Sequence, residues 1–170
     1  MIPTEEIENI NKGWLTLNII WAAMLISVFI YLFVGLYMED KISIPIEKNI
    51  FDILRNTLYI VSFVTLIATK YIRKLVLSGK GLSNVKKAYQ QSNQNIQHPA
   101  LARYTTAMII ALAMSESIGI YGLILFFLGK NQLDLYLLIL ISAAAMLYYR
   151  PKKEEVISMA EELKEPRTVA

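Results

Sequence analysis

The chain has 170 residues, of which 55% are hydrophobic and 18% are charged, and it contains no cysteine. Soluble domains of this length are usually about 45–50% apolar and about a quarter charged, so the composition favours a membrane protein. The lack of cysteine excludes disulfides, thiolate metal sites and cysteine nucleophiles. The formal charge of +3 could suggest a nucleic-acid partner, but membrane topology accounts for the Lys and Arg distribution, and we expect none.

The apolar residues fall into four blocks along the chain. A helix needs about 20 residues, at 1.5 Å each, to span the ~30 Å hydrocarbon core of a bilayer. We therefore predict an all-α integral membrane protein, a four-helix bundle, with crossings at 14–38, 51–71, 104–128 and 133–149. The last block is the shortest. Residues 1–13 form an acidic N-terminal segment without the features of a cleaved signal peptide, and 150–170 form a tail with an amphipathic helix at 154–164.

The connection between the second and third crossings indicates the orientation. Residues 70–103 contain seven Lys or Arg residues and no acidic residue. Because positively charged connections stay on the cytoplasmic side, we expect this one and both termini to face the cytoplasm, with the protein in the inner (cytoplasmic) membrane of the cell. Arg150, Lys152 and Lys153 directly follow the fourth crossing and agree with this orientation.

Glu116 interrupts the third crossing twelve residues from either end, which is about 18 Å along the helix from each. A charged side chain at such a depth costs roughly 2.5–3.5 kcal/mol on insertion scales, so the carboxyl must be protonated, paired or bound to an ion. Ser62, on a hydroxyl-bearing face of the second crossing, could supply a partner. Arg55 lies about 9 Å too far outward, and we expect Asp52 or lipid headgroups to pair with it.

Small residues follow one face of the third crossing. Ala107, Ala111, Ser115 and Gly119 repeat every four residues, and Gly122 continues the stripe. Small residues at this spacing let a neighbouring helix approach closely. We expect the stripe to pack within the chain, against the second crossing.

The sequence around the carboxylate reads Ser115-Glu116-Ser117-Ile118-Gly119-Ile120-Tyr121-Gly122-Leu123. Over residues 102–123 the chain resembles the second helix of the c subunit (proteolipid) of F-type ATP synthases. In that family a membrane carboxylate precedes an Ile-Tyr-Gly-Leu run and binds the transported H⁺ or Na⁺. The resemblance implies that crossings two and three form a c-subunit-like hairpin with a basic cytoplasmic loop.

The resemblance also implies an ion site. Glu116 would bind the ion, Ser117 and Tyr121 match positions that assist sodium binding, and the Met114 carbonyl matches a backbone ligand. The second crossing has no Gln or Glu to complete a sodium shell, so we expect H⁺, with Na⁺ as the alternative. Further implied partners are the lipid bilayer and other membrane subunits, one of which would supply an Arg opposite Glu116. An oligomer is compatible with the resemblance.

Two functions follow from this sequence. The first is reversible ion binding at Glu116 within a larger ion-translocating complex, with no cofactor besides the ion. The alternative is a structural or assembly subunit of the membrane, in which Glu116 is only a helix-packing hydrogen bond. We do not expect an enzyme, because no nucleophile or metal-ligand set accompanies the carboxylate.

Overall fold

A computed structural model describes residues 4–38, 46–77 and 99–164. Within these residues the chain forms five helices and no strand, and the all-α prediction is confirmed. The helices are α1 (Thr4–Tyr37), α2 (Lys48–Leu77), α4 (Pro99–Gly129), α5 (Gln132–Tyr148) and α6 (Lys153–Lys164). The helix predicted at 154–164 is therefore present as α6.

The helices have the length and composition expected of a membrane protein. Three stretches are long and apolar enough to cross a bilayer: Asn11–Tyr37, Lys48–Leu77 and Ala100–Gly129. A fourth span results if α5 and α6, bent by 47° at their junction, are taken together. Each predicted crossing lies within or beside one of the long helices, and the crossing bounds remain predictions of where the bilayer lies along them.

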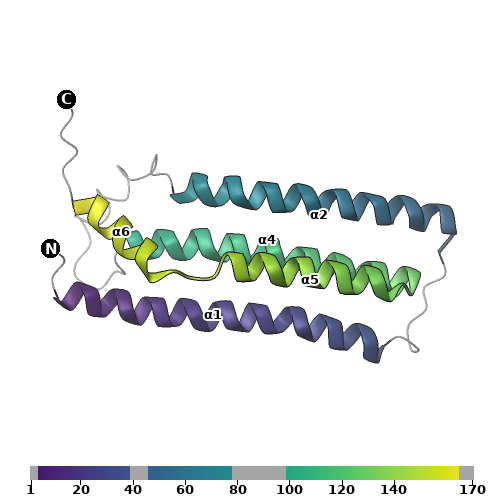
Figure 1. Ribbon diagram of the computed structural model, residues 1–170, viewed down its shortest axis with the longest axis horizontal. Coiled ribbons are helices and arrows are strands. Elements are labelled where there is room, and N and C mark those ends of the chain that lie inside the picture. The colour runs from purple at the N-terminus through teal and green to yellow at the C-terminus, as the bar shows by residue number, and fades with distance from the viewer. Residues whose placement is uncertain (1–3, 39–45, 78–98, 165–170) are drawn as a thin grey trace.

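The four long helices lie lengthwise, and α6 sits across one end (Figure 1). Helix α4 contacts α1, α2 and α5, whereas α1 and α2 lie on opposite sides of the α4–α5 pair (Figure 1). Helices α1 and α4 run in one direction, and α2 and α5 run in the other (Figure 1). The outer helices α1 and α2 therefore pack against the central α4–α5 pair.

A two-residue turn places α5 beside α4. Helix α4 ends at Gly129, and Lys130 adopts the left-handed backbone conformation with φ of 54°. Asn131 then caps α5, because its side chain accepts a hydrogen bond from the backbone N–H of Leu133 at 3.1 Å. So short a connection between two long helices makes them antiparallel neighbours.

The small-residue stripe lies in the α4–α5 interface. The Ser115 carbonyl accepts a hydrogen bond from the Ser142 hydroxyl at 2.7 Å. A Cβ atom added to Gly122 would lie 2.9 Å from the Cβ of Leu138, closer than real Cβ contacts, so glycine is required for this approach. The expected intramolecular packing is thus observed, but the expectation of α2 as the partner is wrong, since the stripe faces α5.

Two apolar clusters fill the spaces on either side of this interface. One joins α1 to α4, α5 and α6 and includes Leu17, Val28 and Leu112. The other joins α2 to the α4–α5 pair around Ile118 and Leu125. Each outer helix thus has its own core, and one carboxylate lies beside each core: the half-buried Glu116 on the α1 side and the buried Asp134 on the α2 side.

Candidate functional site

Glu116 faces α1. Its Oε1 atom lies 2.5 Å from the Ser27 hydroxyl and 2.6 Å from the Tyr31 hydroxyl. Ser27 and Tyr31 are four residues apart on α1, so both project from the same face of that helix. The Ser27 hydroxyl also lies 2.7 Å from the Met24 carbonyl oxygen, which extends the hydrogen-bonded chain into the α1 backbone. Among the described residues, no Lys or Arg pairs with Glu116.

The interhelical contacts also give the depth of this site. Trp21 donates its indole N–H to the Met146 carbonyl at 2.9 Å, so Trp21 marks the level where α5 ends. Ser27 and Tyr31 follow Trp21 by six and ten residues, or about 9–15 Å. Gly129 lies thirteen residues beyond Glu116, or about 20 Å. The carboxyl therefore lies inside the apolar part of the bundle, nearer to the α6 end.

Of the other predicted site residues, Ser117 and Met114 lie next to Glu116 on α4, whereas Tyr121 and Ser62 do not contact it among the described hydrogen bonds. Ser117 donates to the Met114 carbonyl at 2.8 Å, within one turn of α4 and next to Glu116 in the chain. Tyr121 packs in the apolar cluster on the α2 side. Ser62 donates to the Leu58 carbonyl at 2.7 Å within its own helix. The expectation that α2 supplies the hydroxyl partner is wrong in this structure, because both hydroxyls come from α1.

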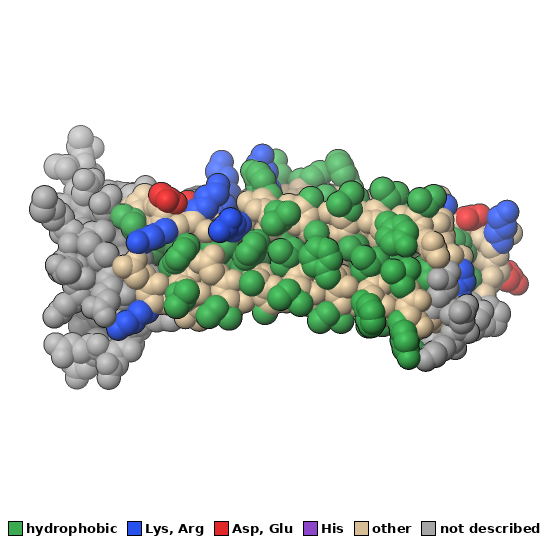
Figure 2. Space-filling model, turned by 60° about the horizontal axis from the view of Figure 1, so that its bottom comes forward, with side chains coloured by type: hydrophobic (Ala, Val, Ile, Leu, Met, Phe, Trp, Pro, Cys, Tyr) green, Lys and Arg blue, Asp and Glu red, His purple; other side chains and the backbone are tan. Residues whose placement is uncertain are grey.

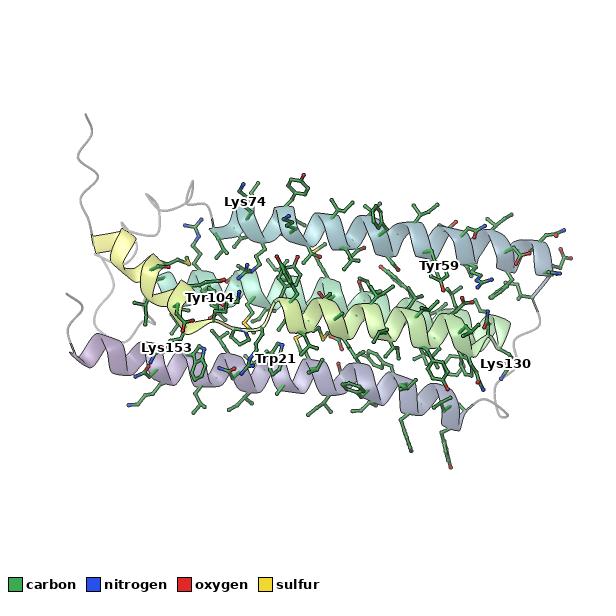
Figure 3. All side chains as sticks on the ribbon, viewed as in Figure 1. Trp21, Tyr59, Lys74, Tyr104, Lys130 and Lys153 are labelled. Atoms are coloured by element: carbon green, nitrogen blue, oxygen red, sulfur yellow. The ribbon has the colours of Figure 1, made fainter. Side chains whose placement is uncertain are left out.

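A second buried carboxylate lies on the opposite side of α4–α5. Asp134, in the first turn of α5, is fully buried. Its Oδ1 atom accepts from Nε and Nη2 of Arg55 at 3.1 and 2.8 Å and from the Tyr59 hydroxyl at 2.7 Å. Tyr59 projects from α2 toward the central helices in Figure 3. The expectation that Asp52 or lipid headgroups pair with Arg55 is therefore wrong.

Two features of the environment of Asp134 complement a negative charge. The guanidinium of Arg55 is a permanent cation, and the first turn of a helix also stabilises negative charge. All three donors reach Oδ1, and the buried Oδ2 atom accepts no hydrogen bond within the part of the chain that is described. The buried Asp134 carboxylate is thus paired with a guanidinium whose side chain is partly exposed, and removal of the cation would leave a buried charge without its partner.

The sequence carried signals for these partners. Asp134 is the one charged residue between Gln132 and Tyr148, an acidic residue inside an apolar block. Such a residue within a membrane span indicates a paired or functional group. Ser27 and Tyr31 gave a weaker signal, as polar groups four residues apart on an otherwise apolar stretch. Only the packing of α1 against α4 brings them to Glu116.

The fold and both sites define an α-helical protein whose long apolar helices fit a membrane, with two carboxylates, one half-buried and one fully buried, in separate environments. Comparisons with models of protein families, with curated proteins and with solved structures found no match to this chain.

Proposed function

We propose that this protein reversibly binds a proton at Glu116 and acts as a membrane subunit of a larger ion-translocating complex. The likeness of residues 102–123 to the carboxylate helix of c subunits supports this proposal, as does the position of Glu116 inside the apolar part of the bundle. The charge asymmetry of the helix ends supports an orientation with the α6 end in the cytoplasm.

The observation that carries the proposal is a count of protons around Glu116. Three pairs of oxygens lie within hydrogen-bonding distance: Ser27 with Met24, Ser27 with Glu116, and Tyr31 with Glu116. Each short contact between oxygens needs one proton, and a carbonyl supplies none. The two hydroxyls supply one proton each, and a protonated Glu116 carboxyl would supply the third. A neutral carboxyl would also avoid the cost of an unpaired charge in the apolar part of the bundle.

The same geometry favours H⁺ over Na⁺. The described polar contacts of Glu116 are two hydroxyls on a single carboxyl oxygen, and the Ser117 hydroxyl already donates to a backbone carbonyl. A sodium ion would need several converging oxygens, whereas a proton needs one acceptor next to its carboxyl. The Ser27 oxygen can be such an acceptor when the Ser27 hydroxyl donates to the Met24 carbonyl, 2.7 Å away.

Carbodiimide modification tests the proposal, because these membrane-permeant reagents react with protonated carboxyl groups. Glu116 should be modified near neutral pH, and raising the pH should protect it. Asp134 is the control within the same protein, since it also lies between helices but is paired with Arg55, and it should not react. Peptide mass spectrometry after labelling distinguishes the two positions.

Sodium provides the second arm of this experiment. If added Na⁺ but not K⁺ protects Glu116 from modification, the bound ion is sodium and not a proton. Modification of neither carboxylate at any pH between 5 and 9 would overturn reversible protonation at Glu116.

The contacts to α1 also support the alternative function, a structural membrane subunit. Through Ser27 and Tyr31, Glu116 joins α1 to α4 at mid-helix, which is what a packing hydrogen bond would do. The nearly isosteric Glu116→Gln separates the two functions. Loss of ion-dependent activity of the assembled complex with α1 still packed supports ion binding, whereas full activity and full assembly would leave Glu116 a packing residue.

A further inference from the structure

The two ends of the helix bundle differ in charge. On α2, α4 and the segment 150–153, seven described cationic side chains lie at the end that carries α6, which we call the basic end, and α1 adds Lys12 there; the seven are Lys70, Arg73, Lys74, Arg103, Arg150, Lys152 and Lys153. The described acidic side chains at that end are Glu154 and Glu155. At the other end, Lys48 and Lys130 are balanced by Glu47 and Asp52. Figure 2 shows blue side chains gathered beside one end of the long green surface.

Two of the seven cations hold helix ends together. Arg73 pairs with Glu155 at 2.5 Å and lies over the ring of Tyr149, so it ties α2 to α6. Arg103 donates to the Val76 carbonyl and ties α4 to α2. The other five, Lys70, Lys74, Arg150, Lys152 and Lys153, pair with no acidic residue in the described parts of the chain.

Arg150 is the best positioned of these five. Its guanidinium lies 5.4 Å from the centre of the Trp21 ring, and the Trp21 indole is itself fixed by its bond to Met146. The side chain of Arg150 is exposed, so its donors remain accessible while its position is restricted. A planar guanidinium recognises phosphate oxygens through paired N–H donors.

The level of these cations matches that of lipid headgroups. Helix α5 ends at Tyr148, the chain bends by 47° into α6, and Arg150 follows directly. Trp21 and the exposed Tyr148 lie at this level, as aromatic residues do at membrane interfaces. Trp21, Lys74 and Lys153 mark this end on three different helices in Figure 3. The cations thus surround the apolar surface where it meets the polar region.

We propose that the basic end binds the phosphate groups of anionic phospholipids of the adjoining leaflet, with Arg150 on Trp21 as the central contact. Charge complementarity selects an anionic headgroup, and the ring of cations around the apolar surface fits lipids that lie against the helices. This site is separate from Glu116 and does not depend on ion binding there.

The test uses the full chain in nanodiscs of equal phosphatidylglycerol and phosphatidylcholine. Lipids that remain bound after mild detergent extraction are counted by native mass spectrometry. Phosphatidylglycerol should be enriched about fivefold among them for each cation that contacts a headgroup. Arg150→Gln should lower this enrichment, and Arg150→Lys should keep most of it. Lys48→Gln, an exposed cation at the other end of α2, is the matched control and should change nothing.

Three results would overturn the proposal. Equal retention of the two lipids would mean that the cations set the orientation of the protein in the membrane but bind no lipid headgroup. An equal loss of enrichment in Lys48→Gln and Arg150→Gln would mean that total charge, not the basic end, attracts lipid. Displacement of phosphatidylglycerol by millimolar inorganic phosphate would assign the site to a soluble phosphate rather than to a lipid.

Discussion

Glu116, which is half-buried, and Asp134, which is fully buried, are two carboxylates that the same pair of central helices presents to opposite sides. Each receives a tyrosine hydroxyl from an outer helix, Tyr31 of α1 at 2.6 Å and Tyr59 of α2 at 2.7 Å. In each case the second partner lies four residues before the tyrosine. That partner is a serine on α1 and an arginine on α2.

The difference between serine and arginine decides what each carboxylate can do. Asp134 has a permanent cation beside it, so gaining a proton would cost the ion pair. Glu116 has hydroxyl partners that can donate or accept, so both hydroxyls could donate to the carboxylate after loss of the proton, at the expense of the Ser27 contact with the Met24 carbonyl. The α2 side is therefore a clamp between helices, and the α1 side is suited to exchange.

The largest effect is expected from breaking the clamp. Arg55→Met leaves Asp134 buried without its cation and should cost about 3 kcal/mol of stability, toward the lower end for buried pairs because the Arg55 side chain is 38% exposed. Unfolding in mixed detergent micelles measures this loss.

The control for this prediction is the double change Arg55→Met with Asp134→Leu. It removes both charges and should recover most of the lost stability. A single Arg55→Met protein as stable as the parent would show that Asp134 is not a clamped charge. The contrast with Glu116 would then fail.

A smaller effect is expected from disturbing the interface that holds both carboxylates. Gly122→Leu places side-chain atoms where even a Cβ would lie 2.9 Å from Leu138, and it should cost about 1–3 kcal/mol. Ala113→Leu is the matched control, because Ala113 is exposed on the same helix and should tolerate the added atoms. The opposite ranking would mean that the exposed face of α4, not the small-residue stripe, makes the essential contact.

The sequence predicted this architecture more successfully than it predicted the partners. Apolar blocks and a stripe of small residues report local properties, which is why the helices and the intramolecular packing of the stripe were predictable. The choice of α5 over α2 as the partner of the stripe depends on the two-residue turn at Lys130 and Asn131. The sequence-based prediction for Arg55 used only its distance along the helix from Glu116. It missed the true partner of Arg55, because Asp134 was treated as part of an apolar block. Pairings between distant residues depend on which helices become neighbours.

The smallest expected effect gives the finest test of the comparison. Tyr31→Phe and Tyr59→Phe each delete one hydroxyl donor and leave the ring in place. A hydrogen bond between neutral groups contributes about 0.5–1.5 kcal/mol, whereas one to a charged group contributes about 1.5–3 kcal/mol. If Glu116 is protonated and Asp134 is ionised, Tyr59→Phe should therefore cost about 1 kcal/mol more stability than Tyr31→Phe at neutral pH.

The pH dependence of the two variants gives a second measurement. At higher pH the stability lost in Tyr31→Phe should grow as Glu116 gives up its proton, while the stability lost in Tyr59→Phe should stay constant. Equal losses that do not change with pH would mean that the two carboxylates share one charge state, and the division between a clamp and an exchangeable site would be wrong.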